Sequence, residues 1–175
     1  MKILRRAVPM LLLALVSASR AHAEGGSPIQ ISLFNPIQIV PETKSVKGVR
    51  LNLIYGKNAD VTGFDYGLVN HTTGNEGALQ IGFVNIDEKD FVGWQDGGFN
   101  MVRGEFTGLQ TGLYNGSEDM SGFAWGWVNR SRNMHGVQLG LVNFTETMNG
   151  VQVGIANIIQ KGKIPFLPIV NWSFN

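Results

Sequence analysis

The sequence predicts an all-β protein built from tandem repeats of 14–15 residues, and three observations support this prediction. Asparagine recurs at a nearly fixed period, glycine precedes most of these asparagines by three residues, and branched or aromatic residues surround each pair. The asparagines are Asn70, Asn85, Asn100, Asn115, Asn129, Asn143, Asn157 and Asn171. Their spacing is 15 residues three times and then 14 residues four times. Self-similarity at a fixed period is the signature of a repeat architecture.

Each repeat is predicted to be one β-strand followed by a polar turn, and the unit from Gly136 to Asn149 is the clearest example. Its first eight residues follow the order Gly, apolar, Gln, apolar, Gly, apolar, apolar, Asn. Successive side chains of a strand point to opposite faces, so Val137 and Leu139 share one face while Gln138 and Gly140 share the other. A helix is disfavoured, because glycine and asparagine in every unit have low helix propensity.

Two architectures satisfy this pattern. In a β-solenoid or roll, each unit is one coil, and equivalent residues stack at the strand spacing of about 4.8 Å. In a small up-and-down outer-membrane β-barrel, each unit is one strand plus a turn, with the bulky row facing lipid and the Gln/Gly row facing the lumen. Membrane strands need about 9–11 residues, whereas the strand core here has about seven, and every connection is short.

The short strand core and the short connections favour the solenoid, and the outer-membrane barrel is the alternative. The aromatic side chains of Phe123, Trp125 and Trp127 count against the solenoid, because they would share one face of a thin coil. A constant unit length counts for it, because each coil has to superpose on the next.

The chain divides into four parts along its length. Residues 1–23 are predicted to be a cleaved signal peptide, because a basic start precedes a short apolar stretch and an Ala-His-Ala cleavage signature. Residues 24–62 hold degenerate copies of the repeat that form an N-terminal cap, and residues 63–160 hold the regular β-repeats. Residues 161–175 are predicted to be a C-terminal cap or the last strand, since their two prolines cannot donate to a strand ladder.

Composition excludes several classes of function. The chain has no cysteine, which excludes disulfides, thiolate metal sites and a cysteine nucleophile. Four of the 14 basic residues lie in residues 1–23 and no acidic residue does, so the remainder carries 10 basic and 13 acidic residues. Its net charge is about −3 and it contains no basic stripe, so a nucleic-acid partner is not expected.

Two of the most regular segments resemble a known family. Gly136–Asn143 reads Gly-Val-Gln-Leu-Gly-Leu-Val-Asn, and Gly108–Asn115 reads Gly-Leu-Gln-Thr-Gly-Leu-Tyr-Asn. They resemble a widespread bacterial surface-repeat family with tandem Gly-Leu-Gln-x-Gly-Leu-x-Asn units behind a signal peptide, and the resemblance covers residues 63–175. It implies an exported envelope or surface location and nothing catalytic. The chain departs from the family pattern where Ala124 and Asp65 replace the glutamine.

Aromatic residues of the strands are the candidate interaction surface. Aromatic side chains beyond the needs of a core mark binding patches, and they can also anchor a protein at a membrane interface. Packing in the core is the commonest fate of such side chains and is the main alternative. The candidates are Tyr66, Trp94, Tyr114, Trp125 and Trp127.

Polar residues that break the repeat are the candidates for chemistry. Asp65 and Asp96 occupy strand positions, and with Glu105 they offer the one polar cluster that an enzyme would need. A local ion pair that includes Arg103 is the simpler explanation. The sequence contains no nucleophile elbow, phosphate loop or dinucleotide fingerprint.

Metal binding has no recognisable motif either. His71 and His135 lie between strands without metal-ligand spacing, and we interpret them as residues of solvated turns. Asp87, Glu88 and Asp90 form an acidic turn that does not match a calcium-binding loop. We therefore predict no catalytic, cofactor-binding or metal site, and no enzymatic activity.

The predicted function is structural or adhesive. We expect an exported protein of a bacterial cell surface, outer membrane or periplasm that presents its stacked repeats to a partner. That partner would be a protein, a glycan or the outer membrane. The alternative function is that of a small outer-membrane barrel, acting as a pore or as a membrane-stabilising element.

Overall fold

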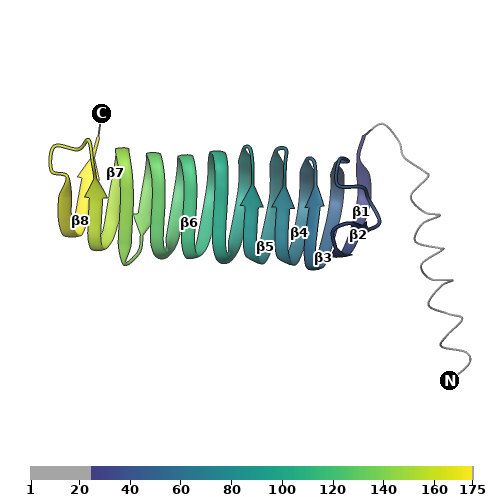
Figure 1. Cartoon of the computed structure of the whole chain (residues 1–175). Helices are drawn as coiled ribbons and strands as arrows, with labels where there is room; N and C mark the ends of the chain where they lie inside the picture. Colours follow the sequence, from purple (N-terminus) through teal and green to yellow (C-terminus); the bar gives the residue numbers. More distant parts are fainter. Residues whose placement is uncertain (1–24, 175) are drawn as a thin grey trace, which may run out of the picture.

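The computed structural model describes residues 25–174, which form β-strands joined by turns (Figure 1). The strands are β1 (Ser27–Phe34), β2 (Ile37–Gln38), β3 (Val46–Asn58), β4 (Val61–Thr72), β5 (Glu76–Asp87), β6 (Phe91–Leu139), β7 (Val142–Ile159) and β8 (Phe166–Ser173). They belong to one sheet with the order β2-β1-β3-β4-β5-β6-β7-β8. The predicted signal peptide, residues 1–23, lies outside the described residues.

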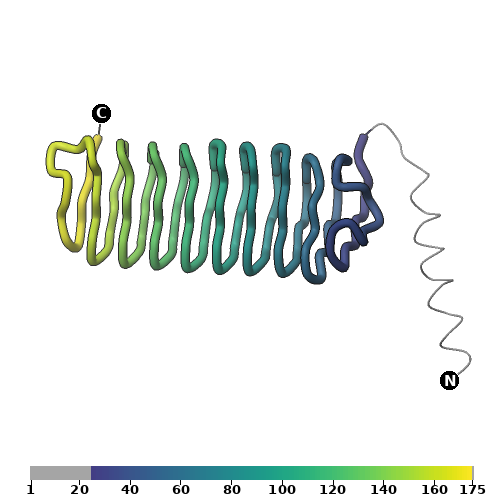
Figure 2. The backbone as a smooth tube through the Cα atoms, viewed as in Figure 1, coloured from purple at the N-terminus to yellow at the C-terminus, as the bar shows by residue number. Residues whose placement is uncertain are grey.

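Consecutive coils pair in parallel, at the period of the repeat. β3 pairs with β4 from Val46 opposite Val61, and β6 pairs with β7 from Val128 opposite Val142. Figure 2 shows a straight stack of flat coils, each of which runs along one side and returns along the other. The predicted β-solenoid is therefore confirmed. The barrel alternative is wrong as a description of the fold, because it requires antiparallel neighbours.

The periodic asparagines form a continuous hydrogen-bonded ladder inside the stack, which we call the asparagine ladder. The Asn70 amide donates to Oδ1 of Asn85 at 2.9 Å, and the same bond repeats at 2.8 Å from Asn85 to Asn100 and onward to Asn157. These amides, up to that of Asn143, also donate to a backbone carbonyl of the next coil. The buried amides are thus paired with groups that the fold supplies, as buried polar groups require.

The ladder departs from the sequence pattern at both ends. Asn52 occupies the register position that glycine holds in the next coil, and its amide donates to Asn70 at 2.8 Å. Gly56 occupies the asparagine position, where a Cβ would lie 1.7 Å from Oδ1 of Asn52, so these two residues have exchanged places. At the other end, Asn171 lies on an antiparallel strand and donates to the backbone carbonyl of Asn157 at 3.3 Å.

Glycine three residues before seven of the eight periodic asparagines makes room for the ladder. A Cβ on Gly112 would lie 2.2 Å from the carbonyl oxygen of Gly97 and 2.8 Å from Nδ2 of Asn100. No side chain fits where two backbones and a buried amide approach this closely. The glycine period therefore follows from the stacking of the coils.

The interior combines a polar row with an apolar row. On the strand before the asparagine, Gln80, Gln95 and Gln110 point inward. Gln110 donates to Oε1 of Gln95, and Gln95 donates to Oε1 of Gln80, both at 2.7 Å. On the returning side of the coil, the rings of Phe91 and Phe106 stack with their centroids 5.2 Å apart. This apolar row continues through Met120, Met134 and Met148, all of them buried. Stacking of identical side chains along the ladder direction gives both rows their regularity.

The last strand closes the C-terminal end of the stack. β8 runs antiparallel to β7, with Val170 opposite Val153, and it contains Pro168, which has no N–H to donate. Such an edge resists pairing with another chain. Residues 166–173 of the predicted C-terminal segment thus form a last strand. Among residues 25–174, none forms a helix long and apolar enough to span a membrane.

Candidate interaction surface

Outward side chains of the strand before each asparagine form a flat surface, which we call the apolar face. It has three rows that follow the strand register from coil to coil. The first row is Ile29, Val49, Phe64, Leu79, Trp94, Leu109, Phe123, Val137, Val151 and Trp172. The second row is Ile31, Leu51, Tyr66, Ile81, Asp96, Thr111, Trp125, Leu139, Val153 and Val170. The third row is Leu53, Leu68, Phe83, Gly98, Leu113, Trp127, Leu141 and Ile155.

The apolar face is uncovered and large. Ile155 is 71% exposed, Trp125 63% and Trp127 62%. Nine spacings of about 4.8 Å between ten coils, and five residues at about 3.3 Å along each strand, give a face of roughly 700 Å². The largest apolar patch of a typical monomer is about 300–600 Å² and is often functional. The face is therefore the candidate interaction surface of this chain.

Four of the five aromatic candidates lie on the apolar face, and the fifth does not. Tyr66, Trp94, Trp125 and Trp127 are exposed members of its rows. Tyr114 directly precedes Asn115 of the ladder and is half-buried. The alternative of core packing is therefore wrong for the four exposed side chains.

The reason for this outward orientation is the polar interior. Inward positions of the same strands hold Gln and Gly, and the backbones stack too closely at the glycines to admit a larger side chain. Bulky residues at the alternate positions must point outward. Phe123, Trp125 and Trp127 therefore do not count against a solenoid. Trp125 and Trp127 project from the outer side of the coil and do not crowd its interior.

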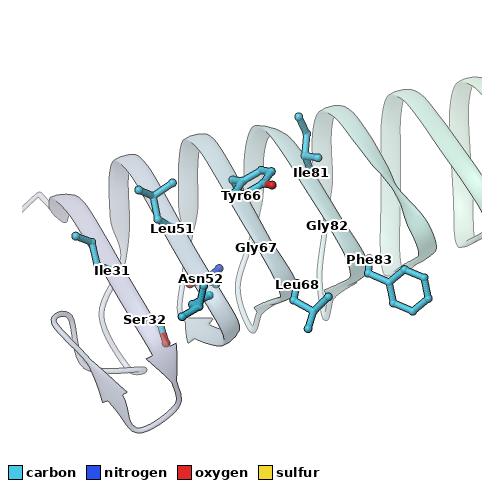
Figure 3. Close-up of a pocket in the computed structure, with 11 residues that line it drawn as sticks. Ile31, Ser32, Leu51, Asn52, Tyr66, Gly67, Leu68, Ile81, Gly82 and Phe83 are labelled. Atoms are coloured by element: carbon cyan, nitrogen blue, oxygen red, sulfur yellow. The ribbon is translucent and has the colours of Figure 1, made fainter.

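Two shallow hollows lie over the glycines, between the second and third rows. Figure 3 shows the first, in which Tyr66 and Ile81 stand on one side of Gly67 and Gly82 and Phe83 stands on the other. Its volume is about 780 Å³, and the second hollow, which begins at the coil of Asp96, measures about 540 Å³. The walls of the first hollow are mostly apolar, so it suits apolar side chains of a partner, whereas Asp96 and Thr111 line part of the second.

The returning side of the coils is charged instead. Arg132 pairs with Glu118 at 2.6 Å, and Lys161 pairs with Glu146 at 2.9 Å. Exposed ion pairs of this kind contribute little to stability, but they keep this side hydrated. The solenoid therefore has one apolar and one hydrophilic side.

A second feature, which we call the acidic cluster, is buried inside the first coils and consists of Arg50, Asp65, Glu76 and Asp87. Arg50 binds Asp65 with two parallel bonds, Nε to Oδ1 at 2.7 Å and Nη2 to Oδ2 at 2.6 Å. Its Nη2 also lies 3.4 Å from Oε2 of Glu76. Gln95 donates to Oδ2 of Asp87 at 2.7 Å. Two of the three carboxyl groups thus contact the guanidinium directly, and Asp87 acts on it only through its charge.

The shared site perturbs the ionisation of its members. Burial, and then the charges of Asp87 and Asp65, raise the pKa of Glu76 well above its ordinary value. Burial also raises the pKa of Asp87 to about 7, although a hydrogen bond with Glu76 and the charge of Arg50 oppose the shift. For Arg50, burial alone lowers the pKa, but the charge and hydrogen bond of Asp65 outweigh it and the pKa is raised. The cluster therefore retains a proton near neutral pH.

The three acidic residues predicted as a possible polar cluster do not come together. Asp65 is buried with Arg50, whereas Asp96 lies on the apolar face and accepts a hydrogen bond from Thr111. Glu105 is exposed, and its backbone N–H donates to Oδ1 of Asp90 at 2.9 Å. The acidic cluster instead contains Glu76 and Asp87, which the sequence analysis missed, and it is sealed from solvent.

The other polar predictions need correction as well. Arg103 lies 4.0 Å from Glu88, so its ion pair is with a residue of the preceding coil. His71 is not in a solvated turn, because its side chain is half-buried and its Nε2 lies 2.9 Å from Oε1 of Glu88; His135 is exposed. Asp87, predicted in a solvated turn, is buried. Within residues 25–174 no group of His, Cys, Asp or Glu side chains is arranged to hold a metal ion.

Fold and surface together define a class, a β-solenoid of 14–15-residue coils with one apolar face. No family model matches the chain, and no curated protein or solved structure matches it.

Proposed function

We propose that this chain is an exported protein of the bacterial cell envelope or surface, with a structural or adhesive role and no catalytic activity. It would belong with the surface-repeat proteins that its Gly-Leu-Gln-x-Gly-Leu-x-Asn units resemble. The observation that carries the proposal is the apolar face, a surface large enough to need a partner.

Two further features support a docking role. The acidic cluster and the asparagine ladder are enclosed, so their polar groups stabilise the coil and are not presented to a substrate. The charged returning side keeps the opposite surface in water while the apolar face is covered. This division suits a protein that lies flat against another surface.

Export is supported by the sequence. Residues 1–23 carry the signature of a cleaved signal peptide, and they supply the excess of basic residues in the chain. The absence of cysteine means that stability outside the cell must come from burial and from ladders of backbone and side-chain hydrogen bonds.

Fractionation of cells that express the full chain tests the proposal. We expect a shortened protein, without residues 1–23, in the envelope fraction. The double variant Trp125→Lys/Trp127→Lys should fold, because both side chains are exposed, but should leave the envelope fraction in part or entirely. The matched control is Met101→Lys, an exposed apolar residue outside the three rows, which should fractionate as the wild type does. Full-length protein in the cytosolic fraction would contradict the proposal, and so would a double variant with unchanged location.

A further inference from the structure

We infer that the apolar face is closed by the same face of a second copy of this chain, with the coils of the two copies running in opposite order. The inference rests on the proposed docking role and names its partner. In this arrangement Asp96 of one copy lies opposite Thr111 of the other. The two-fold axis lies in the interface, parallel to the strands and midway between these two coils.

A polar pair lies at the midpoint of the apolar face. In the second row, which has ten members, the only side chains that are neither aliphatic nor aromatic are those of the fifth and sixth, Asp96 and Thr111. The Thr111 hydroxyl donates to Asp96 Oδ1, and Nε1 of Trp94 donates to the Thr111 hydroxyl at 3.2 Å. A two-fold interface brings a patch onto its own image, so a polar pair at the midpoint meets an equivalent pair.

The same pair decides the order of the coils. When the coils run in opposite order, each carboxylate faces a hydroxyl. When they run in the same order, Asp96 faces Asp96, and two like charges in an apolar interface repel. An apolar partner without a polar counterpart would leave the carboxylate of Asp96 desolvated and unmatched, which is costly.

Apolar surface matches between the two halves of the face. The N-terminal half holds the larger hollow, of about 780 Å³, with Ile81 and Phe83 on its walls (Figure 3). The C-terminal half holds the smaller hollow, whose walls include Trp125 and Trp127, two large and strongly exposed side chains. Opposite order sets Trp125 against Ile81 in the second row and Trp127 against Phe83 in the third row. The apolar walls of the two hollows thus pack against each other.

The area and the charge of the apolar face also favour a second copy as its partner. Covering about 700 Å² on each copy buries about 1,400 Å² in total, within the range of roughly 1,200–2,000 Å² that specific interfaces need. A lipid surface fits less well. The three rows contain no Lys or Arg to contact anionic headgroups, and Asp96 would enter the hydrocarbon.

Sedimentation equilibrium of the purified protein tests the pairing. We expect twice the monomer mass for the wild type and for the control Met101→Lys. Trp125→Lys should sediment as a monomer while its circular dichroism shows that the β-structure is retained. A wild type that stays monomeric at tens of micromolar would overturn the inference.

Cross-linking tests the order of the coils. The chain has no native cysteine, so only the introduced cysteines can react. Leu51 and Val153 are the second and ninth members of the second row, so in opposite order they face each other across about 10 Å. Two copies of Leu51 would instead be seven coils apart, about 34 Å along the stack. A mixture of Leu51→Cys and Val153→Cys chains, treated with a bis-maleimide of about 10 Å reach, should give far more cross-linked dimer than either chain alone. Equal cross-linking of Leu51→Cys with itself would overturn the proposed order.

The two proposals fail in different ways. A monomeric wild type that binds vesicles of phosphatidylethanolamine and phosphatidylglycerol would overturn self-pairing, and lipid would replace the second copy as the partner. The docking role itself is tested by the cell fractionation described above. Full-length protein in the cytosolic fraction would contradict it.

Discussion

Replacing Gly112 with alanine is expected to lower the free energy of unfolding by about 3 kcal/mol or more, although the change adds one methyl group. The added Cβ would lie 2.2 Å from a backbone carbonyl oxygen of the preceding coil and 2.8 Å from Nδ2 of Asn100. Relief of this overlap requires the coils to move apart, which breaks the hydrogen bond from Asn100 to Asn115 in the asparagine ladder. Urea unfolding followed by circular dichroism measures the loss.

The matched control is Gly77→Ala in β5. A Cβ on Gly77 would meet no atom within 4 Å. Because alanine restricts the unfolded chain more than glycine does, this change should be neutral or stabilising by about 0.4–1 kcal/mol. If Gly112→Ala proves as harmless as Gly77→Ala, the close stacking of the coils is contradicted.

Replacing Glu76 with glutamine is expected to make the protein more stable above neutral pH and to flatten the pH dependence of its stability. Glu76 and Asp87 both have a raised pKa in the fold, Asp87 at about 7. A carboxyl group with a raised pKa contributes stability that is full below its unfolded pKa, near 4, and is lost as the pH rises through the folded value. The wild type should therefore lose stability between about pH 4 and 8.

Glutamine removes one of the three buried negative charges and keeps the shape of the side chain. Its oxygen can still accept from Arg50, Thr72 and Gln80, as Oε2 of Glu76 does. Since one pKa unit corresponds to about 1.4 kcal/mol, we expect a gain on the order of 2 kcal/mol at pH 8 and little change at pH 4. Glu105→Gln, on an exposed side chain, is the control and should retain the wild-type profile. A variant that lost stability at every pH would contradict a shared proton in the acidic cluster.

The sequence predicts the coil of this solenoid well, because the coil is repeated. A constant period forces equivalent residues into one row, and the short asparagine-to-glycine spacing recurs often enough to identify the strand and its turn. The parallel pairing then confirms the choice of solenoid over barrel. What the period alone could not decide is whether the asparagines stack in one ladder, which depends on register between neighbouring coils.

The direction of the side chains was harder to predict. Hydrophobic residues usually lie inside, so core packing was the commonest expectation for Trp125 and Trp127. The decisive signal was present in the glycines: a strand whose alternate positions are Gln and Gly stacks too closely to hold an aromatic ring on that side. The glycines set a steric limit on the inner side of the strand in addition to being turn residues. This limit predicts that the bulky rows lie outside.

The acidic cluster was missed because its members are far apart in sequence. Arg50, Asp65 and Gln80 occupy the same register position in three successive coils. A charged residue at a buried position needs an opposite charge one coil away, so the pair Arg50 and Asp65 was recoverable from alignment of the repeats. Glu76 and Asp87 enter from other rows, and only the three-dimensional structure shows that Glu76 contacts the guanidinium and that Asp87 is buried in the same cluster.

The most direct test of the account is whether the apolar face is covered in living cells. Single cysteines at Leu113, on the third row, and at Met101, outside the face, provide two reporters of similar exposure in the isolated coil, 41% for Leu113 and 37% for Met101. We expect a maleimide added to intact cells to label Met101→Cys readily and Leu113→Cys slowly, and the two to become equal after denaturation. Equal labelling of both in intact cells would contradict a covered apolar face.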